Sequence, residues 1–199
     1  MVASYYIQLM FNSKILIPAV VMTIMMGWGN TQASSQTIPA VSIPQLSQSP
    51  ILGQENFSTM TVATVQTDQE IAVLEQSAYE LVNQYRAVLN LATLEFNPQI
   101  SQQARIHSEN MAKHVVEFSH DGFDGRIEAL EDQIVYRSAG ENVAYTMGYD
   151  DPANKAVEEW LKSDDHRQNI EGDYNLTGIG VAKNQRGEYY FTQIFILEN

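Results

Sequence analysis

The sequence predicts an α+β domain, in which helices come first along the chain and a β-hairpin ends it. Three segments carry apolar residues at three- and four-residue steps, the spacing that places them on one face of a helix. Near the end of the chain, Gly178–Ala182 and Tyr189–Ile196 are rich in β-branched and aromatic residues, which is typical of strands. Helices followed by an antiparallel hairpin indicate a layered domain rather than a wound parallel sheet.

Each predicted helix has its own start signal. Thr67-Asp68-Gln69-Glu70 matches a capping box, in which the first and last residues satisfy free backbone N–H groups at a helix start. Asn97-Pro98 and Asp151-Pro152 each combine a capping side chain with a proline at the first helical position. The predicted buried faces are Ile71, Leu74, Ala78, Leu81, Tyr85 and Val88; then Ile100, Ala104, His107 and Met111; then Ala153, Ala156, Val157, Trp160 and Leu161.

Asn184 to Gly187 separates the two predicted strands. A short connection that contains glycine favours a hairpin turn, because glycine accepts a positive φ. The two strands are therefore expected to pair antiparallel.

The N-terminal part of the chain differs from the rest in composition. Residues 1–33 hold one charge, Lys14, followed by the apolar run Ile15 to Trp28 and a small-residue exit at Thr31-Gln32-Ala33. This order is typical of a secretory signal peptide. The alternative is an uncleaved membrane anchor, but the run is shorter than the roughly 20 apolar residues that a spanning helix needs. We expect cleavage, no stable membrane span after it, and a secreted or cell-envelope-associated protein.

Residues 34–68 are rich in Ser, Thr, Gln and Pro and show no sustained period. Such a segment buries too little apolar surface to offset its ordering entropy. It is predicted to be a flexible linker, with the folded domain at 69–199.

The charge balance narrows the choice of partners. The chain has 11 basic and 24 acidic residues, a net charge of −13, and no cysteine. Proteins bind nucleic acid and anionic lipid surfaces through Lys and Arg. Because acidic residues outnumber basic ones in this chain, nucleic acid is excluded as a partner. Without disulfides, the core alone must hold the fold, which a domain of about 130 residues can do.

The four histidines lie in different contexts. His107 is on the apolar stripe of the second predicted helix, which favours a structural role, and His114 is at that helix's end. His120 and His166 lie in polar stretches just past helices, where functional groups are often held by a rigid scaffold.

From about Tyr79 to its end, the chain resembles the bacterial type of the CAP superfamily, which includes cysteine-rich secretory proteins, antigen 5 and pathogenesis-related class 1 proteins. Seven motifs in order carry the resemblance: Leu81-Val-Asn-Gln-Tyr-Arg86, His107-Ser-Glu-Asn-Met-Ala112, Phe118-Ser-His120, Ala139-Gly-Glu-Asn-Val-Ala144, Trp160-Leu-Lys-Ser-Asp-Asp-His-Arg-Gln-Asn-Ile170, Thr177-Gly-Ile-Gly-Val-Ala182 and Tyr189-Tyr-Phe-Thr-Gln-Ile-Phe195.

The resemblance implies a three-layer α-β-α sandwich with a small antiparallel sheet and a cleft lined by two histidines and two glutamates. His120, Glu141 and His166 match three of these positions. The family's second glutamate often lies five residues before the tryptophan, where this chain has Lys155; Glu158, one helical turn further on, or Glu159 is the candidate fourth group.

Two classes of function fit these residues. One is a non-enzymatic module that binds an extracellular ligand, such as a cell-envelope component, a lipid or a protein. The other is a metal-assisted hydrolase, with Glu141 as general base and His120 and His166 holding zinc or another divalent cation. A metal-free polar network that only stabilises the fold is the structural alternative.

Overall fold

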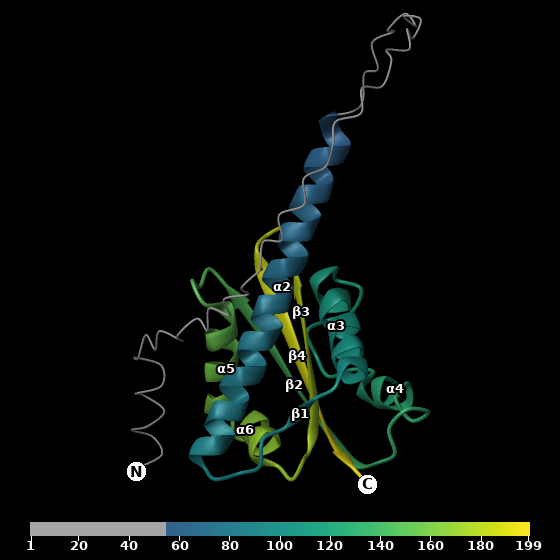
Figure 1. The fold of residues 1–199 in the computed structure, drawn as a ribbon, viewed down its shortest axis with the longest axis vertical. Coiled ribbons are helices and arrows are strands. Elements are labelled where there is room, and N and C mark those ends of the chain that lie inside the picture. Colours follow the sequence, from purple (N-terminus) through teal and green to yellow (C-terminus); the bar gives the residue numbers. More distant parts are fainter. Residues whose placement is uncertain (1–54) are drawn as a thin grey trace, which may run out of the picture.

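The computed structural model describes residues 55–199, with side chains from Thr67 onward. The elements are α2 (Glu55–Val88), β1 (Glu95–Phe96), α3 (Pro98–Ala112), α4 (Phe123–Glu128), β2 (Tyr136–Met147), α5 (Pro152–Lys162), α6 (Asp164–Glu171), β3 (Leu176–Lys183) and β4 (Glu188–Glu198) (Figure 1). The strands form one sheet in the order β1-β3-β4-β2. Three strands are antiparallel, and the two-residue β1 adds in parallel beside β3.

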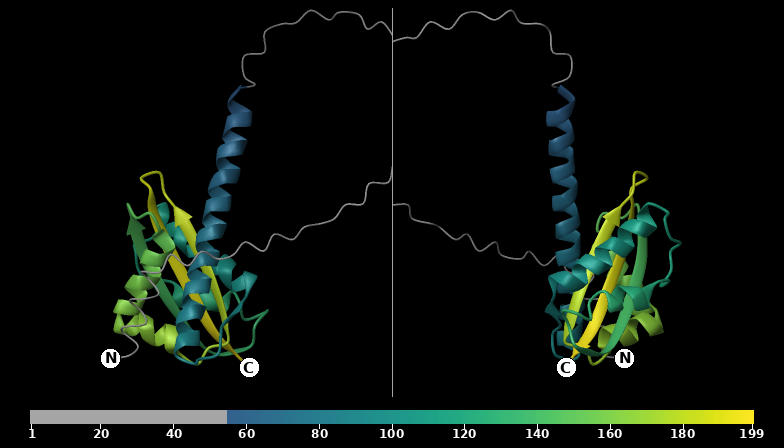
Figure 2. Two further views of the ribbon diagram at one scale, coloured as in Figure 1. Left: turned by 60° about the vertical axis from the view of Figure 1, so that its left-hand side comes forward. Right: turned by 90° about the vertical axis from the view of Figure 1, so that its right-hand side faces the viewer.

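Helices cover both faces of this sheet, so the predicted three-layer sandwich is confirmed (Figure 2). On one face, α2 and α5 pack on the sheet through a cluster that includes Ala78, Val82, Trp160 and Phe191. On the other face, Ile100 and Ala104 of α3 and residues after α3 pack against the far side of β4. The core is therefore divided by the sheet into two apolar layers.

The predicted helix starts are confirmed at two of three places. The Asn97 side chain accepts from the backbone N–H groups of Gln99 and Ile100, and the Asp151 side chain accepts from that of Asn154. The predicted hairpin is also present, with Gly187 at φ 78° between β3 and β4.

The first helix begins earlier than its capping box predicted. α2 runs from Glu55 without a break at Thr67, because no proline or glycine interrupts it. Residues 55–68 of the predicted linker are therefore helical. The predicted signal peptide (1–33) and the first part of the linker lie outside the described residues. Within the described part of the chain, no helix is both long enough and apolar enough to span a bilayer.

Candidate functional site

The segment Ala139–Ala144 lies in β2, an edge strand, and its side chains alternate between the two helical layers. Asn142 points towards α6, where its Nδ2 donates to the His166 carbonyl (3.0 Å) and its Oδ1 accepts from Asn169 (2.9 Å). Gly140 lies on the same side, where a Cβ would come within 2.8 Å of the Tyr174 hydroxyl. Glu141 points to the opposite side, towards α4. One strand thus positions groups from both layers.

The Glu141 carboxylate is almost completely enclosed, with its side chain 2% exposed. Arg126 of α4 binds it in a bidentate manner, from Nε to Oε2 (2.8 Å) and from Nη2 to Oε1 (2.7 Å). His120 Nδ1 lies 3.0 Å from Oε1. Because a carboxylate only accepts, Nδ1 of His120 carries the proton of this hydrogen bond, and Nε2 takes no part in it.

His166 approaches His120 from the other layer. It lies on α6, a helix of its own rather than a stretch past one, and the ring centroids of the two histidines are 5.9 Å apart. Burial lowers the pKa of His166, and the nearby His120 lowers it further. The neutral form of His166 is therefore favoured. His120 keeps half of its side chain (48%) exposed.

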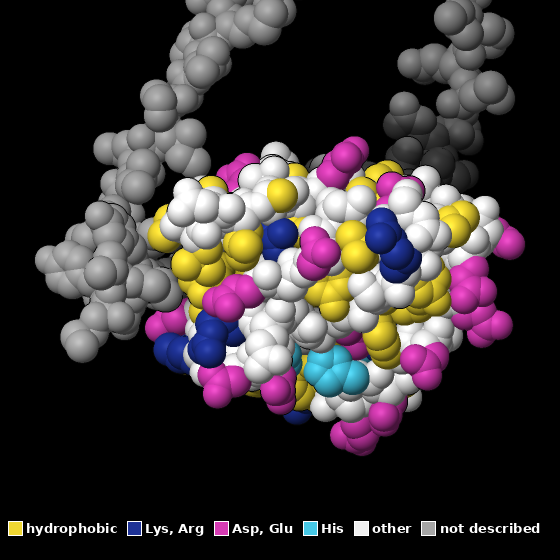
Figure 3. All heavy atoms as spheres, turned by 90° about the horizontal axis from the view of Figure 1, so that it is seen from below, with side chains coloured by type: hydrophobic (Ala, Val, Ile, Leu, Met, Phe, Trp, Pro, Cys, Tyr) yellow, Lys and Arg dark blue, Asp and Glu magenta, His cyan; other side chains and the backbone are white. Residues whose placement is uncertain are grey.

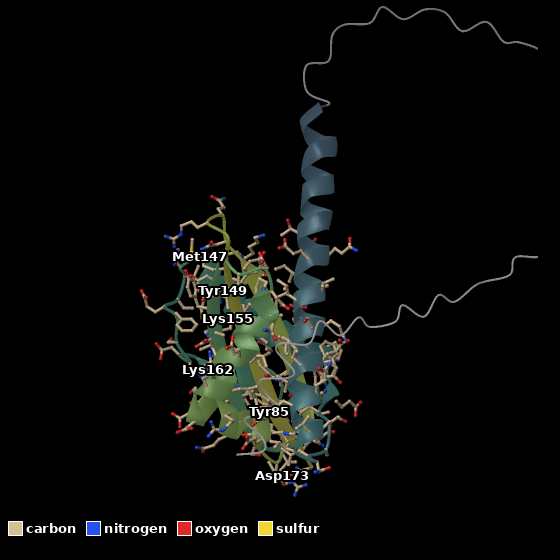
Figure 4. All side chains as sticks on the ribbon, turned by 90° about the vertical axis from the view of Figure 1, so that its left-hand side faces the viewer. Tyr85, Met147, Tyr149, Lys155, Lys162 and Asp173 are labelled. Carbon is tan, nitrogen blue, oxygen red and sulfur yellow. The ribbon has the colours of Figure 1, made fainter. Side chains whose placement is uncertain are left out.

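The fourth predicted group does not join this cluster. Glu158 pairs with Lys155 (3.6 Å) and Lys162 (2.8 Å) on its own helix. Glu159 contacts the same two lysines, and Lys155 also lies over the ring of Tyr149 (Figure 4). Within residues 67–199, neither glutamate has a recorded contact with His120 or His166. Three of the predicted residues, His120, Glu141 and His166, lie together. The fourth member of the cluster is Arg126, which was not predicted.

Arg126 was not among the predicted site residues, because it lies in none of the seven motifs. Burial of Glu141 was the signal that could have found it. An acidic side chain in the middle of a strand needs a cation when it is buried, and Arg126 and Arg137 are the two basic residues between His120 and Glu141.

His107 holds the backbone next to His120 through a hydrogen bond. It is buried, as its place on the apolar stripe predicted, and its Nε2 donates to the Ser119 carbonyl (2.9 Å), next to His120. His114, just past α3, instead accepts from Arg186 and lies apart from the pair.

Burial lowers the pKa of His107 below its ordinary value of 6.5. The unfolded chain therefore binds a proton at a higher pH than the folded chain, so stability should fall as pH drops below about 6.5. We expect a His107→Gln variant to lose less stability between pH 7 and pH 5 than the wild type does. Urea unfolding at several pH values measures this, and parallel pH profiles for the two proteins would contradict it.

The donors beside His120 are fewer than the predicted zinc site requires. Nε2 of His120 and the ring of His166 are available, but Glu141 is bound to Arg126. No group of three or more His, Cys, Asp or Glu side chains in the described residues is placed to hold a metal ion. Structural and catalytic zinc sites use at least three protein ligands, so the donor set is one ligand short.

His120 is exposed and His166 is partly exposed at the molecular surface. Figure 3 shows histidine side chains on the face at the α6 end of the domain, among acidic and polar neighbours. A cavity of about 980 Å³ lies elsewhere, between α2, the end of α3 and the β3–β4 hairpin. Its basic side chains are each paired with a carboxylate, as in Arg105 with Glu75 and Lys183 with Glu70.

Comparison with known proteins agrees with this architecture. The family model described as "CAP: Cysteine-rich secretory protein family" matches residues 79–195. A Bacillus subtilis protein, the uncharacterized protein YkwD, is 30% identical over 138 residues, which are 68% of this chain and 52% of that protein. The chain thus spans about half the length of the curated relative that it matches.

Solved structures give the same result. An extracellular protein with an SCP domain from Bacillus anthracis is 28% identical with a TM-score of 0.56, over 66% of this chain and 43% of that one. A cysteine-rich secretory protein from Staphylococcus aureus is 25% identical, with a TM-score of 0.51 over 64% and 40%. An outer surface protein from Borrelia burgdorferi shares the fold at 19% identity, with a TM-score of 0.52 over 61% and 90%.

Proposed function

Because this chain belongs to the cysteine-rich secretory protein (CAP) family, we propose that it is an extracytoplasmic binding module. Its ligand contacts the histidine pair and the exposed apolar side chains that continue from it along β2. The extracellular and outer-surface descriptions of similar proteins support the location.

The observation that carries this proposal is an exposed strip, formed by Phe118, Tyr145 and Met147. These side chains are 50%, 42% and 52% exposed. Tyr145 and Met147 follow Glu141 at even spacing on β2, so they lie on the same face of the strand. Phe118 is two residues before His120 and packs with Tyr190, which also contacts Tyr145. Contiguous exposed apolar side chains of this kind mark interaction sites.

The strip and the histidine pair together form an elongated surface. Glu141 and Met147 are six residues apart on one strand, which corresponds to about 20 Å. That length suits an extended ligand of several residues rather than a single small molecule.

The charges and ring angles at this surface favour a peptide. Two acidic groups beside the strip are neutralised internally, Glu141 by Arg126 and Glu188 by Arg186. The rings of Phe118 and Tyr145 are tilted by 58° and 65° to that of Tyr190, so they form no flat platform. Gaps between tilted rings suit apolar side chains, and the ligand class proposed is a peptide or protein segment at the cell envelope.

The hydrolase alternative is disfavoured by Arg126. A general base needs a free lone pair directed at the proton that it removes. Both oxygens of Glu141 already accept from Arg126, and the side chain has almost no exposed surface. Binding therefore accounts for the site better than proton abstraction does.

Retention of a ligand from a cell-envelope extract tests the proposal, with the full chain as bait. We expect a Tyr145→Ser/Met147→Ser variant to retain at least about tenfold less ligand, since each apolar side chain contributes about 1.5–3 kcal/mol when it is buried. Val73→Ser is the matched control, because Val73 is also exposed but lies on α2. Equal saturable retention by the double variant and the wild type would refute the binding surface.

A further inference from the structure

We propose that Arg126 neutralises Glu141 and so keeps a metal ion from the His120–His166 pair: the native chain holds no zinc at this site, and removal of the Arg126 charge raises the zinc affinity of the pair. The cation preference of the His120–His166 pair does not depend on which ligand the strip binds.

The orientation of His120 suits a metal ligand. A histidine that binds a metal through one nitrogen usually donates its other N–H to a carboxylate, which orients the ring and makes it a stronger ligand. His120 already has this arrangement: Nδ1 donates to Glu141, which leaves Nε2 as the ligand atom, and the His166 ring lies 5.9 Å away between centroids. The two imidazoles are thus disposed as half of a zinc site.

The negative charge of the Glu141 carboxylate, which binds His120, is neutralised by Arg126. The guanidinium of Arg126 contacts both oxygens of Glu141, and the arginine and glutamate side chains are 10% and 2% exposed. With so little water near the pair, their charges cancel each other. His120 therefore receives little help from Glu141 in attracting a cation, and the guanidinium itself repels one.

Arg126 is also held in place by backbone carbonyl groups. Its Nη1 donates to the Asp121 carbonyl (2.9 Å) and its Nη2 to the His120 carbonyl (3.3 Å). The chain reverses there at Gly122, where φ is 78° and a Cβ would lie 3.4 Å from Nη1. Backbone and carboxylate together hold the guanidinium on Glu141, so the charge of this carboxylate stays neutralised. Arg126 is therefore a determinant of cation specificity at this site.

Zinc titration of the full chain by calorimetry tests this. The wild type should give the same heats as a His120→Ala/His166→Ala variant. Arg126→Gln should bind zinc at least about tenfold more tightly than the wild type, because it leaves Glu141 anionic behind His120. Arg126→Lys, which retains the positive charge, should behave like the wild type. An Arg126→Gln/Glu141→Gln variant should lose the gain.

Two results would overturn the proposal. One is a wild type that binds zinc as tightly as Arg126→Gln does, and the other is an Arg126→Gln variant that folds but gains no affinity. If Arg126→Gln does not fold, the wild type decides by histidine NMR: zinc at one equivalent should leave the His120 and His166 ring signals unchanged, and shifted signals would refute the proposal. These readouts follow zinc rather than the peptide ligand, so the two proposals can fail separately.

Discussion

A Gly180→Ala substitution is expected to lower the free energy of unfolding by about 3 kcal/mol or more, the upper range for overpacking a core. Gly180 lies in β3 directly under α3. An added Cβ would be 2.0 Å from the backbone nitrogen of Arg105 and 2.3 Å from the carbonyl carbon of Ala104. Both atoms belong to helix backbone, so no side-chain rotation relieves the overlap.

The close approach at Gly180 is also where α3 is hydrogen-bonded to the sheet. Ser108 Oγ donates to the Gly180 carbonyl (2.9 Å), and Ser101 Oγ accepts from the Ile179 amide (3.1 Å). Moving α3 outwards to accept a methyl group would stretch these bonds, which adds to the packing cost.

Urea unfolding measures this effect, with Gly125→Ala as control. Gly125 lies inside α4, and an added Cβ there meets nothing within 4 Å. The control should therefore be neutral or stabilising by up to about 1 kcal/mol. Similar stabilities for the two variants would show that α3 can move away from the sheet without cost.

Arg126→Ala is expected to destabilise the chain by about 3–5 kcal/mol, the usual cost of leaving one partner of a buried ion pair without its counter-charge. The side chains of Arg126 and Glu141 are 10% and 2% exposed, so water cannot replace the lost contacts. The carbonyls of His120 and Asp121 would lose their donor as well.

A double-mutant cycle separates the ion pair from simple truncation. Replacing both groups by apolar residues, as in Arg126→Met/Glu141→Leu, should recover most of the loss, because no charge is then left buried. Thermal or urea unfolding of Arg126→Met, Glu141→Leu and the double variant gives the coupling energy. If the two single losses simply add, the two side chains do not act as a pair.

Local signals in the sequence were sufficient for some elements. Asn97-Pro98 and Asp151-Pro152 mark the starts of α3 and α5, and Asn184–Gly187 marks the hairpin, because capping and turn formation depend on neighbouring residues. These elements are observed as predicted.

Other elements depend on partners that are distant in sequence. β2 was not predicted as a strand, since Arg137–Asn142 is largely polar or small, and its extended form comes from pairing with β4. Arg126 was missed for the same reason: its role is defined by Glu141, which reaches it across the sheet edge. The motif match grouped His120, Glu141 and His166, and the structure has contacts between His120 and each of the other two. The pairing of Lys155 with Glu158 and Glu159 follows from their i,i+3 and i,i+4 spacing on the predicted helix, but it was not used to exclude the two glutamates from the site.

The alternation of β2 has a consequence for the link between ligand binding and folding. His120 follows the layer of α3, whereas His166 belongs to α6 in the opposite layer. A partly folded chain with only one layer docked lacks the pair altogether. A ligand that contacts both histidines therefore binds the complete native state alone, so it stabilises the whole domain by an amount that grows with the ratio of free ligand concentration to Kd. Ligand occupancy of the site and the free energy of unfolding should therefore rise together.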